Sequence, residues 1–206
     1  MIAIIDYGMG NAGSIHNMLA RIGAESTITS SPDSIAAAEK LILPGVGAFD
    51  QAMTNLRQLG LVSLLDDRVM GQGVPILGIC LGMQLLSRSS EEGTLPGLGW
   101  IPARTIRFRF DGPAAGLRIP HMGWNRVEVN RRGSILDGLP DGARFYFVHS
   151  YHVCCEDPQN VLATTNYGIT FHSAVIRGNI AGTQFHPEKS HKFGLHVLRR
   201  FAEGGG

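Results

Sequence analysis

The sequence has few cysteines, few aromatic residues and little net charge. Only three of its 206 residues are cysteines, and two of them, Cys154 and Cys155, are adjacent. Because so few thiols at this spacing do not form a disulfide framework, we expect a reducing, cytoplasmic environment, with Cys154 and Cys155 packed in an apolar run. Lys and Arg total 18 and Asp and Glu 17, so the formal net charge is +1. This balance provides no global field for nucleic acid, and we expect no nucleic-acid partner.

Long apolar runs are also missing. No stretch approaches the ~20 apolar residues that cross a bilayer. Met1 leads straight into a short apolar segment without the basic residues that open a signal peptide, so we expect neither membrane association nor export. With 44% hydrophobic and 17% charged residues, and without repeats, the chain is typical of a globular protein. We expect one domain over residues 1–203 and a disordered glycine tail over residues 204–206.

Strand and helix patterns alternate as far as Arg88. Short apolar strands are expected at residues 1–5, 25–30, 41–43 and 74–79, and helical spacing of apolar residues separates them. This alternation predicts an open, mostly parallel, doubly wound α/β sheet flanked by helices. After Arg88, turn signals separate short strands and predict an antiparallel, strand-rich second half with a closing helix. The strands expected there are residues 100–110, 124–129, 144–148, 161–165, 173–176 and 180–184.

A sharp turn from strand to helix is predicted at residues 78–82. The apolar strand ends in Gly78-Ile79-Cys80-Leu81-Gly82, and helical spacing follows at once. This is the cysteine version of a nucleophile elbow, in which strained backbone exposes a nucleophile at the start of a helix. Glycine on both sides avoids a crowded Cβ, and the helix N-terminus favours the thiolate of Cys80. The alternative is a buried cysteine that acts as a small hydrophobic residue.

A cysteine nucleophile needs a general base, a group that orients the base, and donors for an oxyanion. His186 follows an expected strand, and Glu188 can reach back to its imidazole and fix the tautomer. His149 is the second candidate base, but it has no acid near it in the sequence. The Leu81 N–H is one expected oxyanion donor, and the glycine-rich segment Pro44-Gly45-Val46-Gly47 supplies the other. The remaining histidines are interpreted as structural: His16, His121, His152, His172, His191 and His196.

A glycine-rich turn follows the first expected strand. Its Gly8-x-Gly10-x-x-Gly13 spacing matches the dinucleotide-binding fingerprint. That site also needs an acid at the end of the second strand, where this chain has Ser30-Ser31-Pro32. We therefore favour tight packing of the turn and expect no cofactor and no metal. A nucleotide-binding module remains an alternative function.

Several motifs together resemble a known family. Gly78-Ile79-Cys80-Leu81-Gly82-Met83-Gln84 and Gln184-Phe185-His186-Pro187-Glu188 resemble the class I, triad-type glutamine amidotransferases, which implies their flavodoxin-like fold. The resemblance runs from Asp6 to Ser190. Three further motifs look like the branch that supplies ammonia for imidazole glycerol phosphate synthesis in histidine biosynthesis: Pro44-Gly45-Val46-Gly47, Pro120-His121-Met122-Gly123-Trp124-Asn125 and Tyr146-Phe147-Val148-His149-Ser150-Tyr151.

The resemblance implies that the protein hydrolyses L-glutamine to glutamate and ammonia. Cys80 would form a thioester with the substrate, His186 would carry the proton to the departing ammonia, and Glu188 would orient His186. Other roles are implied by position alone. Val46, Gly47 and Leu81 would hold the oxyanion, and Gly47, Gln84, Ser150 and Tyr151 would bind glutamine.

The resemblance also implies a partner. In this family branch, ammonia passes through an interior tunnel to a (βα)8-barrel cyclase, with which the glutaminase forms a heterodimer. Gly10, Asn11, Met122 and Trp124 would face that partner. Residues 104–118 and 190–194 instead resemble paralogous subunits that supply ammonia for surface-sugar amidination, so the acceptor stays open. A cysteine hydrolase that acts on another amide without a partner is a further alternative.

Overall fold

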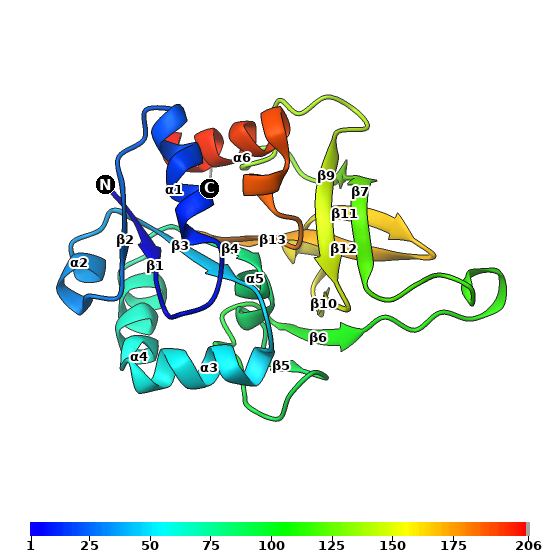
Figure 1. Ribbon diagram of the computed structural model, residues 1–206, viewed down its shortest axis with the longest axis horizontal. Coiled ribbons are helices and arrows are strands. Elements are labelled where there is room, and N and C mark those ends of the chain that lie inside the picture. Colours follow the sequence, from blue (N-terminus) through cyan, green and yellow to red (C-terminus); the bar gives the residue numbers. More distant parts are fainter. Residues whose placement is uncertain (205–206) are drawn as a thin grey trace.

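The computed structural model describes residues 1–204 and has a central sheet with helices on both faces (Figure 1). Five strands of this sheet are parallel and lie in the order β2-β1-β3-β4-β13. The predicted open, mostly parallel sheet is confirmed. The bounds of these strands are β1 Ile2–Ile5, β2 Ser26–Thr29, β3 Lys40–Gly45, β4 Ile76–Cys80 and β13 Ile180–Thr183.

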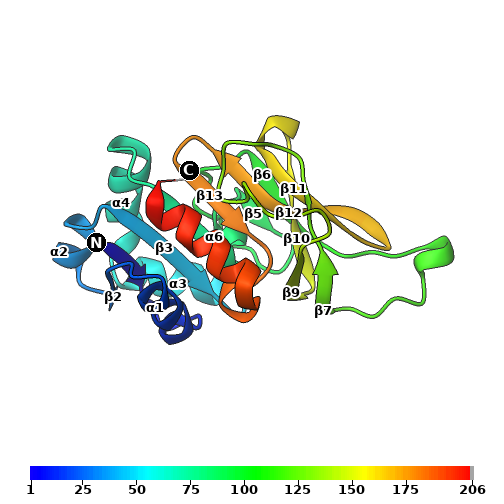
Figure 2. The same ribbon diagram turned by 90° about the horizontal axis from the view of Figure 1, so that it is seen from above.

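Alternating side chains of the parallel strands explain why helices cover both faces. Ile2 and Ile4 pack in a cluster with residues of α1 (Ala12–Arg21) and α6 (His191–Glu203), which lie across one face (Figure 2). Ala3 and Ile5 point to the opposite face and pack in a second cluster. The helices of that second face are α2 Pro32–Ala36, α3 Phe49–Gln58, α4 Leu61–Asp66 with a π-helical turn at Asp67–Gly71, and α5 Leu81–Leu85.

The second half of the chain extends the sheet with mainly antiparallel strands, as predicted, although β5 pairs with β6 in parallel. From β13 outward the order is β12-β10-β6-β5, while β11 also pairs with β12 and β8 pairs with β11. A separate antiparallel pair consists of β7 and β9. Bounds are β5 Ser89–Ser90, β6 Ala103–Arg107, β7 His121–Arg126, β8 Glu128–Val129, β9 Arg144–His149, β10 Tyr151–Cys155, β11 Val161–Tyr167 and β12 Ile169–Arg177. Short 3-10 turns lie at Gly112–Ala114, Pro158–Asn160 and Pro187–Lys189.

Several details differ from the sequence prediction. The strand expected at residues 100–110 is shorter, the one expected at 124–129 is divided between β7 and β8, and the short β5 was not predicted. The strand β10 was not predicted, because only Ser150 separates it from β9 and no glycine or proline marks the boundary. The expectation that both adjacent cysteines pack is wrong for Cys154, which is exposed, while Cys155 is partly buried. Neighbouring side chains of a strand point to opposite faces, so two consecutive cysteines do not share one environment.

The C-terminal end of the described chain is a capped helix. Gly204 ends α6 in the left-handed conformation, with φ of 105°. Of the predicted glycine tail, residues 205–206 lie outside the described residues. The single domain over residues 1–203 stays a prediction. Across residues 1–204, no helix has both the length and the apolar character of a membrane span.

Close backbone contacts at the elbow require glycine. A Cβ on Gly82 would lie 1.8 Å from the Leu43 carbonyl oxygen of β3, and a Cβ on Gly78 would lie 2.8 Å from the Gly82 carbonyl oxygen. At the first turn, a Cβ on Gly10 would lie 2.9 Å from the Pro44 side chain, whereas Gly13 faces open space. Close packing therefore explains why residue 10 must be glycine. This agrees with the interpretation, favoured from the sequence, that the first turn is a tightly packed turn.

We expect Gly82→Ala to destabilise the protein by about 3 kcal/mol, because the added methyl group meets backbone that cannot move aside. For a chain of this size the melting temperature should fall by roughly 6–12 °C. Gly13→Ala is the matched control and should leave the melting temperature unchanged or slightly raised. Thermal unfolding followed by circular dichroism measures both variants, and a Gly82→Ala protein as stable as Gly13→Ala would contradict the packing argument.

Candidate active site

A cavity of about 310 Å³ lies where β3 and β4 end. Most of the catalytic and glutamine-binding residues predicted from the sequence line it, although they come from segments far apart in the chain. This convergence follows from parallel strands, whose carboxyl ends meet at one edge of the sheet. The lining residues are Val46, Gly47, Cys80, Gln84, Glu92, Pro120, Val148, His149, Ser150, Tyr151 and His186.

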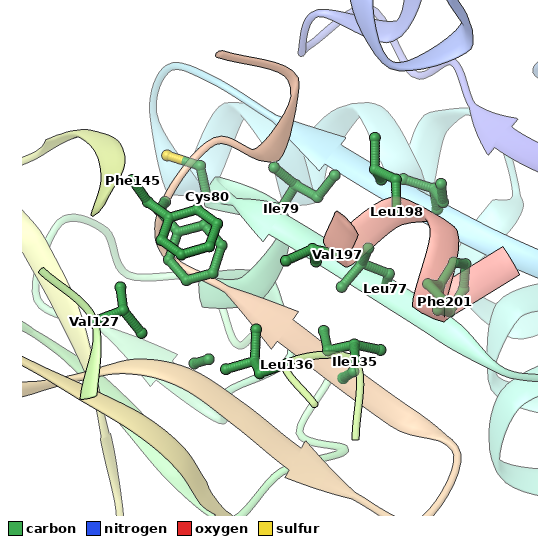
Figure 3. Packing of buried hydrophobic residues seen from close by; sticks show 14 of the residues in the cluster. Leu77, Ile79, Cys80, Val127, Ile135, Leu136, Phe145, Val197, Leu198 and Phe201 are labelled. Atoms are coloured by element: carbon green, nitrogen blue, oxygen red, sulfur yellow. The ribbon is translucent and has the colours of Figure 1, made fainter. Parts of the chain in front are cut away.

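Cys80 occupies the turn between β4 and α5 in strained backbone. Its φ of 54° and ψ of −108° are rare for a residue other than glycine. Figure 3 shows Cys80 at the margin of the buried cluster that contains Ile79 and Leu77. The next residue, Leu81, is the first of α5, so its N–H has no acceptor within the helix. The turn thus has the strained geometry that the glycine-flanked motif predicts, with a backbone donor beside the thiol.

His186 and Glu188 form a buried pair next to this cysteine. The 3-10 turn Pro187–Lys189 brings Glu188 back toward the imidazole, and His186 Nδ1 lies 2.8 Å from Glu188 Oε1. The two side chains are only 1% and 2% exposed. Since the carboxylate accepts from Nδ1–H, the other ring nitrogen, Nε2, is left for chemistry, and it has no partner among the described residues. Ser190 Oγ–H donates to the His186 carbonyl oxygen at 2.6 Å and holds the backbone of the turn.

The charge state of His186 follows from opposing effects. Burial lowers the pKa of His186, but the Cys80 side chain and the Glu188 carboxylate outweigh burial and raise the pKa to about 10. His186 is therefore an imidazolium at neutral pH. A buried, oriented imidazolium beside a cysteine is equipped to give a proton to a leaving group.

The segment Pro44–Gly47 is pressed against the elbow. A Cβ on Gly45 would lie 2.8 Å from the Gly82 nitrogen and 2.8 Å from the Tyr7 hydroxyl, so only glycine fits there. Gly47 has φ of 104°, which lets the chain turn along the cavity wall. The Tyr7 hydroxyl donates to the Pro44 carbonyl oxygen at 2.6 Å, and burial raises the pKa of Tyr7, so this donor stays protonated.

Three residues of the site were missed in the sequence. Tyr7 supports the Pro44–Gly47 segment, and nothing in its local sequence indicates a contact so far along the chain. Gln184 Nε2 lies 3.7 Å from Cys80 Sγ, and its place two residues before His186 was the available signal. Glu92 lines the cavity and accepts from the Phe49 N–H at 2.9 Å, while burial raises its pKa. A single acid in a glycine-rich loop carries no recognisable motif.

A model of the class-I glutamine amidotransferase family matches residues 3–203. The chain belongs to this family. A relative from Methanococcus maripaludis, named imidazole glycerol phosphate synthase subunit HisH 2, is 56% identical over 201 residues that cover 98% of each chain. A relative of the same name from Pseudomonas aeruginosa is 50% identical, covering 98% of this chain and 99% of that one. The family resemblance predicted from the sequence is confirmed.

Solved structures give the same fold for this amidotransferase. A structure described as a glutamine amidotransferase superposes with a TM-score of 0.74 at 21% identity, covering 98% of this chain and 100% of that chain. A structure of PurLQS from Thermotoga maritima superposes with a TM-score of 0.73 at 17% identity, with 98% of this chain and 97% of that chain covered. The predicted α/β fold class is therefore confirmed.

The second candidate base of the amidotransferase, His149, is not free to act as one. Its Nδ1 lies 2.8 Å from the Tyr151 carbonyl oxygen and its Nε2 lies 3.0 Å from His121 Nδ1. Burial lowers the pKa of His149 well below its usual range, so the ring is neutral. The geometry favours His186 as the acid–base residue.

The residues expected at a partner interface of the amidotransferase do not line the cavity. Met122 and Trp124 lie on β7 and are 62% and 38% exposed. Gly10 packs against Pro44, and Asn11 follows it. Their role in binding a partner remains a prediction, which the exposure of two large apolar side chains on one strand favours.

Proposed function

We propose that this amidotransferase is the glutaminase subunit of imidazole glycerol phosphate synthase. It hydrolyses L-glutamine to glutamate and ammonia and passes the ammonia to a cyclase subunit. The observation that carries the proposal is the placement of Cys80 and His186 in one cavity, with Glu188 paired to His186, in a chain that is about half identical to proteins of that name. Those names favour this acceptor over surface-sugar amidination, and the packing of Gly10 disfavours the nucleotide-binding alternative.

The reaction proceeds in two steps. The Cys80 sulfur attacks the carboxamide carbon, and the carbonyl oxygen becomes an oxyanion held by the Leu81 N–H and the Val46–Gly47 segment. His186 gives its Nε2 proton to the nitrogen as the carbon–nitrogen bond breaks, and ammonia leaves. A water molecule then attacks the thioester while His186 takes a proton from it, which releases glutamate and restores Cys80.

Glutamine binding uses polar groups of the cavity wall. Gln84 Nε2 donates to the Tyr151 carbonyl oxygen and to Gln184 Oε1, each at 3.1 Å. Its own Oε1 is therefore the atom offered to the substrate, where it accepts from the α-ammonium group. The Glu92 carboxylate adds charge complementarity to the same ammonium group, and Gly47, Ser150 and Tyr151 complete the site.

The partner is a (βα)8-barrel cyclase that covers the exposed apolar side chains of β7. Met122 and Trp124 are of the residue types that are enriched in interfaces. Gly10 and Asn11 lie at the first turn, which packs on Pro44, so this turn would connect a bound partner to the oxyanion segment.

The test measures glutamate production by the chain alone, with the cyclase subunit, and with the cyclase and its nucleotide ligand. We expect little turnover by the chain alone and strong stimulation when both are added. An unchanged rate would overturn the coupling to a cyclase, and full turnover without a partner would favour the partner-independent hydrolase. Rescue of a histidine auxotroph that lacks its own glutaminase subunit identifies the acceptor; an active glutaminase that fails to rescue would point to sugar amidination.

A further inference from the structure

Two buried histidines lie at the cavity, and one of them, His149, is part of its lining. His121 on β7 and His149 on β9 are opposite each other in the antiparallel register. His121 Nδ1 lies 3.0 Å from His149 Nε2, and His149 Nδ1 lies 2.8 Å from the Tyr151 carbonyl oxygen. The remaining ring nitrogen, His121 Nε2, lies 3.3 Å from Asn125 Nδ2. All four ring nitrogens therefore have a partner, and the partners decide where the protons are.

The Asn125 amide fixes one end of this chain of hydrogen bonds. Its Nδ2 donates to the Asn166 carbonyl oxygen at 2.8 Å, and its Oδ1 accepts from the Arg126 N–H at 2.8 Å. Because both contacts define which side of the amide is nitrogen, the group that faces His121 Nε2 is a donor. His121 Nε2 must then accept, so the His121 proton is on Nδ1.

The Tyr151 carbonyl oxygen fixes the other end. It can only accept, so His149 carries its proton on Nδ1. The proton on His121 Nδ1 points at His149 Nε2, which must accept it. Both rings are therefore neutral Nδ1–H tautomers, and neither can switch tautomer without placing two donors or two acceptors face to face. Burial lowers the pKa of His121 to about 4 and that of His149 well below its usual range, which agrees with neutral rings.

The hydrogen bonds continue from the histidine pair to the nucleophile. The Tyr151 carbonyl oxygen that accepts from His149 also accepts from Gln84 Nε2. The same Gln84 Nε2 donates to Gln184 Oε1, which turns Gln184 Nε2 toward Cys80 Sγ at 3.7 Å. One carbonyl group thus links the histidines to the Gln84 amide, which lines the cavity, and through it to the Gln184 amide, which contacts the thiol.

We propose that His121 and His149 are positioning residues of the glutamine site, which hold the Tyr151 carbonyl group and through it orient Gln84 and Gln184. This inference rests on the proposed glutaminase function. In the orientation described, Gln84 presents its oxygen to the substrate and Gln184 presents its N–H to Cys80. Loss of the His121 donor leaves His149 Nε2 without its partner, so the ring that donates to the Tyr151 carbonyl oxygen is held at one end only.

Two substitutions at His121 separate hydrogen bonding from packing. The ring stacks with Phe147 at a centroid distance of 4.8 Å and with Tyr167 at 4.1 Å. His121→Phe keeps the stacking and removes the donor, whereas His121→Asn keeps a donor near the Nδ1 position and removes the stacking. We expect the KM for glutamine in the cyclase complex to rise about fivefold in His121→Phe, the effect of losing one hydrogen bond, and no more than about twofold in His121→Asn.

The stability of the two variants should follow the opposite order to their KM values. His121→Phe, which has the larger effect on KM, should have the higher melting temperature. A purely structural role predicts the same order in both measurements, so a KM that is less affected in His121→Phe than in His121→Asn overturns the proposal. His152→Phe is the matched control. It replaces a buried histidine that packs on Phe108 and has no hydrogen-bond partner at either ring nitrogen among the described residues, and it should leave the KM unchanged.

Nitrogen-15 NMR of the isolated chain tests the tautomers without any enzymatic assay. We expect His121 and His149 to show the neutral Nδ1–H form from pH 5 to pH 8. A Nε2–H form or a titration near pH 6.5 at either ring in the wild-type chain overturns the proposal. An inactive wild-type complex would instead refute the proposed function and leave the NMR result to decide the proton positions.

Discussion

Cys80→Ala should reduce glutamate formation by the reconstituted complex by about 10⁴-fold or more, because no other thiol of the described residues lines the cavity. Alanine keeps the Cβ and therefore keeps the strain of a positive φ, so the substitution isolates the loss of the sulfur. The folded structure should persist, since the side chain at this position lies at the margin of the buried cluster (Figure 3).

The measurement is the steady-state rate of glutamate production, with the melting temperature as a check on folding. Cys154→Ala is the matched control, because Cys154 is exposed on β10 and does not line the cavity. It should keep the full rate. A Cys80→Ala protein that retains glutaminase activity would refute the assignment of the nucleophile.

His186→Ala should lower kcat by about 10⁴-fold, and Glu188→Gln should lower it by about 10²-fold. The first change removes the acid–base group itself. The second keeps the imidazole but replaces the carboxylate that accepts from Nδ1–H at 2.8 Å, so the ring is less well oriented. Equal losses in the two variants would show that Glu188 does more than orient His186.

The pH dependence of kcat should also change in Glu188→Gln, and the direction of the change follows from the pKa of His186. Glu188 helps to raise the pKa of His186 to about 10, and in the proposed reaction the imidazolium protonates the departing nitrogen so that it leaves as ammonia. The rate should therefore fall as the pH rises through that pKa. Without the carboxylate charge the pKa of His186 is lower, so the alkaline limb of kcat should move to lower pH in Glu188→Gln. Glu156→Gln, which alters a surface pair with Arg88, is the control and should leave the profile in place.

The turn at Cys80 and the contact between His186 and Glu188 were predictable from sequence because their geometry is local. Gly78 and Gly82 flank Cys80 at the spacing that a tight strand-to-helix turn needs, and the structure has the close contacts that exclude a side chain there. His186 and Glu188 are two residues apart, so a single 3-10 turn brings them together. The parallel sheet was likewise predictable, from the alternation of strands and helices.

The rest of the site depends on contacts between distant segments. Gln184 reaches Cys80 across 104 positions of sequence, and His121 reaches His149 across 28. The sequence favoured a structural role for His121 and left His149 as a candidate base. Both residues are hydrogen-bonded to each other, because β7 and β9 pair in a register that no local pattern specifies.

Steric rules within a few residues were enough to predict the elbow, the histidine–glutamate pair and the parallel half of the sheet. Local rules suffice where bond geometry and short spacing restrict the chain to one arrangement. The orientation of Gln84 and Gln184, the support of Pro44 by Tyr7 and the proton positions of the histidine pair depend on which strands become neighbours. Which strands become neighbours depends on the burial of apolar surface over the whole chain. These features therefore exist only once the sheet has formed.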